Sequence, residues 1–174
     1  MHSSLSDILA EKFGIAEGVY EDARKARRDK GGSTAEMLIS KNVISETQLL
    51  EALSELYDVP FWPELPLDNI DFEFTRHVPI HFLKNYSMVP LVIQLHPNQA
   101  AADADPQERK FSETLPDYLR YIIAVNDPAH FQQLDDLVRI LGISDFQVIL
   151  STKSAITAAI NLSYDFSRDS AEQL

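Results

Sequence analysis

The chain has 174 residues, of which 45% are hydrophobic and 24% charged, and its formal net charge at pH 7 is −12. This composition fits a globular protein with one core or two small subdomains, and the negative charge argues against a general nucleic-acid binder, because phosphate would be repelled. The lack of cysteine excludes disulfides, thiolate zinc sites and cysteine nucleophiles. No apolar run approaches the roughly 18–20 residues of a membrane span, so we expect a cytoplasmic protein.

Residues 1–59 are predicted to form a helical subdomain that contains a weak internal repeat. At an offset of 29 residues, segment 9–23 aligns with segment 38–52: LAEKFGIAEGVYEDA with LISKNVISETQLLEA. Such a repeat favours two packed copies of a short helix, a turn and a longer helix. Gly31-Gly32 is the expected turn between the copies. In the second copy, a capping box is followed by an apolar stripe: Ser45-Glu46-Thr47-Gln48, then Leu49, Ala52, Leu53 and Leu56.

A proline-rich connector is predicted at residues 60–66, where DVPFWPELP places three prolines in nine residues. An α/β subdomain then covers residues 67–166. Its first parts are a short helix that begins at Pro79 and a strand over 88–95, in which Pro90 indicates a sheet edge or a strand start. Residues 96–118 lack periodicity and are predicted to form a mobile insertion between two paired strands.

Residues 121–165 are predicted to form a strand, a helix, a strand and a helix. The strands are 121–125 and 146–150, both short and rich in β-forming residues. The first helix is expected to have Asp127 as N-cap and Pro128 as its first residue, and to end at Gly142. Ser151-Thr152 can cap the last helix, and residues 167–174 are expected to fray. The predicted fold class is α+β: a small helical bundle, then an α/β sandwich with a three-stranded sheet and about three helices.

Four segments in this order resemble the amino-terminal domain of type II secretion and type IV pilus assembly ATPases. They are LISKNVISETQLLEAL with YDVPF, RHVPIHFLKNYSMVPL, IIAVNDP with LDDL, and VILSTKSAITAAINLSY. The resemblance covers roughly residues 5–165 apart from the insertion. It implies a helical subdomain followed by an α/β subdomain, and a role ahead of the bacterial motor, docked onto the cytoplasmic part of an inner-membrane platform protein.

Some members of that family bind cyclic di-GMP through an Arg-Leu-Gly start, a second glycine and a glutamine in each helical copy. The glycines let the backbone approach the ligand, and arginine supplies a planar fork. None of these determinants is present here, so we do not expect cyclic di-GMP binding. The residues at these positions are Ser4, Ser6, Phe13 and Arg27 in the first copy, and Ser33, Ala35, Asn42 and Leu56 in the second.

The sequence contains no P-loop, the nucleotide-binding motif of such motors. Its five glycines, at positions 14, 18, 31, 32 and 142, do not allow a G-x-x-x-x-G-K-[ST] loop. We therefore expect no catalytic residues, no cofactor and no ATP hydrolysis. The chain would be either the front part of a longer ATPase or a stand-alone protein with the same domain, and the sequence does not distinguish a secretion system from a pilus.

Two groups of polar residues could suggest chemistry, but neither is expected to perform it. Glu73, His77 and His81 have the four-residue spacing of metal ligands on a helix, yet Pro79 interrupts them, so no metal site is expected. Asp135 and Asp136 flank an apolar stripe, as on the solvated face of an amphipathic helix, and His130 near them carries no supporting motif.

A basic run and two aromatic residues remain as candidate docking sites for a partner. The basic run is Arg24, Lys25, Arg27, Arg28 and Lys30. The basic run could simply form the solvated last turns of a helix, where cations complement the helix dipole. It could instead be a docking patch for an acidic protein or for lipid headgroups. Phe61 and Trp62 could cement the connector or anchor a partner. A sensor that binds cyclic di-GMP or another anion through the basic run is the alternative function.

Overall fold

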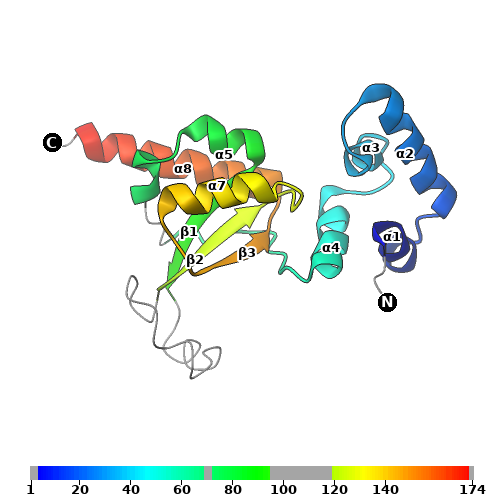
Figure 1. Ribbon diagram of the computed structural model, residues 1–174, viewed down its shortest axis with the longest axis horizontal. Coiled ribbons are helices and arrows are strands. Elements are labelled where there is room, and N and C mark those ends of the chain that lie inside the picture. The colour runs from blue at the N-terminus through cyan, green and yellow to red at the C-terminus, as the bar shows by residue number, and fades with distance from the viewer. Residues whose placement is uncertain (1–3, 69–71, 95–118, 173–174) are drawn as a thin grey trace, which may run out of the picture. The chain divides into compact units, whose positions relative to one another are not determined.

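The computed structural model describes residues 4–68, 72–94 and 119–172 and divides the chain into two compact units (Figure 1). Unit 1 spans Met1–Pro63 and unit 2 spans Glu64–Leu174. The predicted insertion 96–118 lies outside the described residues. In unit 1 the elements are α1 (Leu5–Phe13), α2 (Glu17–Lys30), α3 (Thr34–Ser40) and α4 (Glu46–Tyr57).

In unit 1, the two predicted copies form two helix pairs whose equivalent residues share the core. Leu9 and Leu38, which the repeat aligns, are both fully buried. The aligned pair Ala23 and Ala52 is buried as well, in the same apolar cluster. Helix α1 packs against α4, and α2 packs against α3. Residues that the predicted repeat aligns are therefore buried together in one core.

Serine capping boxes begin three of the four helices of unit 1. The N–H of Asp7 donates to the Ser4 hydroxyl, the N–H of Glu36 to that of Ser33, and each acid accepts the N–H of its serine. Ser45 and Gln48 form the predicted third box. The Ser4 N–H and hydroxyl also hold the pKa of Asp7 below its ordinary value, because both hydrogen bonds favour the carboxylate.

The turn between the copies needs glycine. Gly31 and Gly32 have φ values of 74° and 83°, a region where other residues are strained. A Cβ on Gly32 would also lie 2.8 Å from Glu36 Oε2, which is the oxygen that closes the second capping box. The predicted Gly-Gly turn is confirmed.

Unit 2 is built on a three-stranded sheet in the order β1-β2-β3. Strand β1 pairs antiparallel with β2, placing Pro90 opposite Ile123 and Val92 opposite Tyr121. Strand β2 pairs parallel with β3 through a helical crossover. The α+β class and the three-stranded sheet are as predicted. The elements are η1 (a 3₁₀ helix, Glu73–Arg76), α5 (Ile80–Tyr86), β1 (Met88–Gln94), β2 (Leu119–Val125), α7 (Phe131–Leu141), β3 (Phe146–Leu150) and α8 (Lys153–Glu172).

The sheet lies between helices. Figure 1 shows α7 in front of the strands and α8 behind them, and both α5 and α8 contact β1. The central strand is the most deeply buried part of the unit, since Ile122, Ile123 and Ala124 are inaccessible to solvent. Such a strand, covered on both faces, reads as a continuous apolar run, as residues 121–125 do. Pro90, which cannot donate to a ladder, lies on the edge strand as predicted.

The predicted start of α7 is wrong. The helix begins at Phe131, after a turn in which the Asp127 carboxylate accepts the N–H of Ala129. Asp127 therefore closes a turn on its own backbone instead of capping the helix. His130 occupies the position before the helix, and its ring lies edge-on to that of Tyr86 with the centroids 5.7 Å apart. The predicted stop at Gly142 is confirmed, with φ 65°.

Helix α8 is longer than predicted. It begins after Thr152, whose hydroxyl accepts the N–H of Ala155 as expected of a cap. It then continues to Glu172, through most of the segment that was expected to fray. Residues 166–172 contain no glycine or proline to stop a helix. Phe166 also stacks on Phe72, with the ring centroids 5.1 Å apart, which fixes this part of the helix.

Tyr164 ties α8 to the chain ahead of α5. Its hydroxyl donates to the carbonyl of Val78, and its ring meets that of Phe74 edge-on with the centroids 6.1 Å apart. Burial raises the pKa of Tyr164 to about 12, because the phenolate would be poorly solvated there.

Unit 2 is expected to lose stability at strongly alkaline pH through Tyr164. A pKa that is raised in the folded state contributes stability below its ordinary value near 10, and this contribution is lost as the pH rises toward about 12. Urea unfolding followed by amide hydrogen exchange should show Tyr164→Phe to be less stable than the parent near pH 8 and closer to it near pH 11. If the difference in the free energy of unfolding between the two proteins is the same at both pH values, the Tyr164 proton does not contribute to the stability of unit 2.

Candidate functional site

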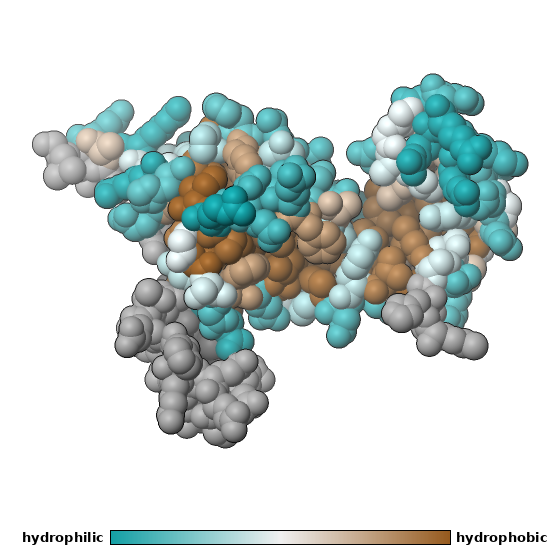
Figure 2. All heavy atoms as spheres, in the orientation of Figure 1, coloured by the Kyte–Doolittle hydropathy of each residue, from teal (hydrophilic) through white to brown (hydrophobic). Residues whose placement is uncertain are grey.

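The basic run lies on α2 and faces solvent. Its five side chains are all exposed, and helix α2 turns only Ala23 fully into the core. Arg24 is partly occupied, since its guanidinium lies 3.2 Å from the Glu21 carboxylate one turn earlier. Figure 2 shows α2 presenting a strongly hydrophilic surface. Residues 24–30 hold five of the 15 Lys and Arg residues of the chain but only one of its 27 acidic residues.

Phe61 and Trp62 are half-buried in the last segment of unit 1, after α4 ends at Tyr57. The structure therefore places the two candidate docking groups on different segments, the basic run on a helix and the aromatic pair in an extended stretch. Partial burial leaves each ring with less apolar surface for a partner than an exposed anchor would offer.

The serine positions that stand in place of the family's arginines have structural duties. Ser4 and Ser33 cap α1 and α3 through their hydroxyls. Asn42, at the position of the second glycine, adopts a left-handed conformation with φ 55°. The backbone form that a glycine would favour is thus kept in this copy.

The polar groups considered for chemistry lie on separate elements. His77 follows η1, while His81 lies within α5, beyond Pro79. Asp136 lies 3.9 Å from Arg139 on the exposed side of α7. Among the described residues, no three histidine, aspartate or glutamate side chains are grouped so that they could hold a metal ion.

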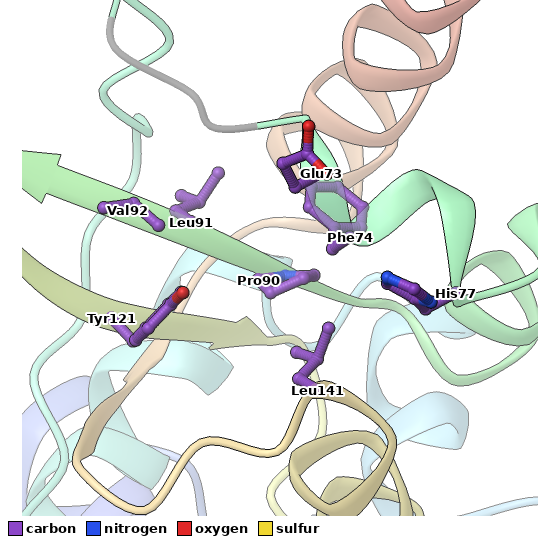
Figure 3. Close-up of a pocket in the computed structure, with 8 residues that line it drawn as sticks. All are labelled: Glu73, Phe74, His77, Pro90, Leu91, Val92, Tyr121 and Leu141. Atoms are coloured by element: carbon purple, nitrogen blue, oxygen red, sulfur yellow. The ribbon is translucent and has the colours of Figure 1, made fainter. Parts of the chain in front are cut away.

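The structure adds a pocket that the sequence did not predict (Figure 3). It lies where η1 approaches the edge strand β1, and it has a volume of about 190 Å³. We call it the η1–β1 pocket. Its residues come from η1 and the turn after it, from two strands and from the end of α7: Glu73, Phe74, His77, Pro90, Leu91, Val92, Tyr121 and Leu141.

Strand register explains how these distant residues meet. Val92 is directly opposite Tyr121 in the β1–β2 ladder, and Pro90 is two residues from Val92, so all three side chains share one face of the sheet. Leu141 reaches the same pocket from the C-terminal end of α7. Glu73 and His77 were noticeable in the sequence only as potential metal ligands. The pairing of residue 92 with residue 121 crosses the segment 95–118, and no local pattern could have given it.

One segment of the sequence and the fold each resemble known proteins. Residues 120–170, which run from β2 into α8, match the family model of the MshEN domain. The predicted resemblance to the amino-terminal domain of secretion and pilus assembly ATPases is confirmed. No curated protein sequence matches the chain.

Two solved structures have the same fold. A structure of MshE with cdg superposes with a TM-score of 0.62 and 21% identity, over 91% of this chain and 97% of that one. The N-terminal domain of XpsE superposes with a TM-score of 0.55 and 15% identity, over 91% of this chain and 92% of that one. At these identities the likeness establishes the α+β fold.

Proposed function

We propose that this chain is a protein-interaction module of the secretion and pilus ATPase type, which docks its motor onto an inner-membrane platform protein. The shared fold with the N-terminal domain of XpsE and the MshEN match over residues 120–170 support this proposal. No helix among the described residues is long and apolar enough to cross a membrane. In this proposal the module works in the cytoplasm and reaches the membrane only through its partner.

The basic run is the surface that we propose for docking, and its charge carries the argument. It is a local positive patch on a chain whose net charge is −12, so it would orient an approaching acidic surface toward α2. Its side chains are exposed and mostly outside ion pairs of the described residues, which leaves them able to meet carboxylates. Phe61 and Trp62 would contribute apolar contact beside such an interface only through their exposed parts.

Reversing the charge of the basic run is expected to weaken this docking strongly. The variant Arg24→Glu/Lys25→Glu/Arg28→Glu should bind the cytoplasmic part of the platform protein at least tenfold more weakly and with a smaller salt dependence, because electrostatic steering is screened by salt. The matched control, Lys84→Glu/Arg139→Glu/Arg168→Glu, reverses three exposed cations of unit 2 and changes the net charge equally. Biolayer interferometry at low and high salt measures both. Equal weakening by the two variants would refute a specific role of the basic run.

The alternative function is a sensor for cyclic di-GMP or another anion. The observations that favour it are the fold shared with MshE, solved with cdg, and the left-handed Asn42. Calorimetry with cyclic di-GMP separates the two functions. We expect no heat of binding, because Ser4 and Ser33 supply capping hydroxyls where guanidinium groups would be needed. A micromolar affinity would favour the sensor.

A further inference from the structure

The η1–β1 pocket has an apolar interior of the size of one small ring system. Phe74 and Leu91 are 7% and 1% exposed, and Pro90 is buried beside them. Val92, Tyr121 and Leu141 are half-buried, so each turns part of its surface toward the space. A cavity of roughly 150 Å³ holds benzene. The 190 Å³ of this pocket therefore have room for one ring with a short substituent.

Its carboxylate and imidazole come from η1 and the turn after it, and the Tyr121 phenol comes from β2. Figure 3 shows Glu73 above Pro90, His77 beside Pro90, and Leu141 below all three. The Glu73 carboxylate lies 3.6 Å from the Arg76 guanidinium, but both side chains are about 70% exposed, at 67% and 72%. An exposed pair of this kind is weak and screened by solvent, so it does not by itself keep a cation from approaching the Glu73 carboxylate.

Charge selects the sign of the ligand. Glu73 is the group of fixed charge among the lining residues, and the chain as a whole carries −12. An anion would be repelled by both, whereas a cation gains the carboxylate. Phe74 and Tyr121 add two aromatic rings to the lining, and such rings attract ammonium groups positioned over their faces.

From these features we propose that the η1–β1 pocket binds a small organic cation, with its apolar ring against Pro90, Val92 and Leu141 and its ammonium group beside Glu73. This site lies wholly within unit 2 and is separate from the basic run. It does not depend on the proposed docking function.

Three indole probes of different charge test the proposal on the full chain. Tryptamine carries the ammonium, indole is neutral, and indole-3-propionate carries a carboxylate. Titrations followed by the chemical shifts of η1, β1 and β2 amides should give an affinity for tryptamine at least tenfold higher than for indole-3-propionate. The affinity for indole should lie between the two. Glu73→Gln should weaken the binding of tryptamine about threefold to fivefold, which corresponds to the loss of one exposed ion pair, and should leave the binding of indole unchanged.

A steric variant checks the location. Leu141→Trp should fill the pocket and abolish binding of all three probes, while Ile140→Trp, the neighbouring residue of α7 and 46% exposed, should leave binding unchanged. If Leu141→Trp proves misfolded by its amide spectrum, Val92→Phe blocks the same space from β1. Equal affinity for the three probes, tryptamine binding that survives pocket filling, or no shift at millimolar tryptamine would each overturn the proposal.

Discussion

Replacing Leu137 with alanine is expected to lower the free energy of unfolding of unit 2 by about 2–5 kcal/mol. Leu137 is fully buried on the face of α7 that covers the sheet, so truncation removes apolar contacts and leaves a cavity. This is a large share of the stability of a domain of this size, which is typically about 5–15 kcal/mol.

The measurement has to resolve the two units. The single tryptophan, Trp62, belongs to unit 1, so fluorescence alone would not report unit 2. Amide hydrogen exchange of β2 during a urea titration follows the sheet directly. Phe131→Ala is the matched control on the same helix, because Phe131 is 54% exposed and its truncation should cost far less. Similar losses for the two variants would contradict the observed packing of α7.

Leu38→Ala is expected to have the second large effect, on unit 1. Leu38 is inaccessible to solvent in the shared core of the two repeat copies, and its loss should again cost about 2–5 kcal/mol. Unit 1 is small, and small units bury a smaller fraction of their surface, so they have less stability to lose. We therefore expect most of the helical signal of unit 1 to melt at a temperature at which unit 2 remains folded.

The repeat supplies the controls for that experiment. Leu9→Ala, at the aligned position of the first copy, should destabilise unit 1 comparably, because Leu9 is equally buried. Val19→Ala, on α2 and 39% exposed, should have an effect within about 0.5 kcal/mol. Hydrogen exchange of α1 and α4, together with Trp62 fluorescence, gives the readout. A large effect of Leu38→Ala without one of Leu9→Ala would show that the two copies contribute unequally to the core.

Much of the secondary structure could be predicted because its signals are local. The Ser45 capping box, the Gly142 stop and the strand 146–150 each depend on a few neighbouring residues, and all three are observed. The start of α7 was mispredicted for a local reason as well. Asp127 offers the same carboxylate to a turn or to a helix N-terminus, and the sequence does not show which N–H it accepts.

The candidate site was less accessible to prediction. The basic run was visible as a run of charge, and the structure shows it exposed on α2. The η1–β1 pocket was not visible, because it depends on the register between β1 and β2 and on where α7 ends above them. Glu73 and His77 suggested a metal site by their spacing alone. Their neighbours Pro90, Tyr121 and Leu141 show a largely apolar space instead.

The twin capping boxes of Ser4 and Ser33 have a consequence for engineering. The hydrogen bonds that close each box lie within four consecutive residues. In each copy of the repeat, a capping box thus determines where the first helix begins. The start of each copy is therefore encoded locally. A designer who duplicates or exchanges the copies needs to keep only the apolar positions that face the shared core complementary to one another.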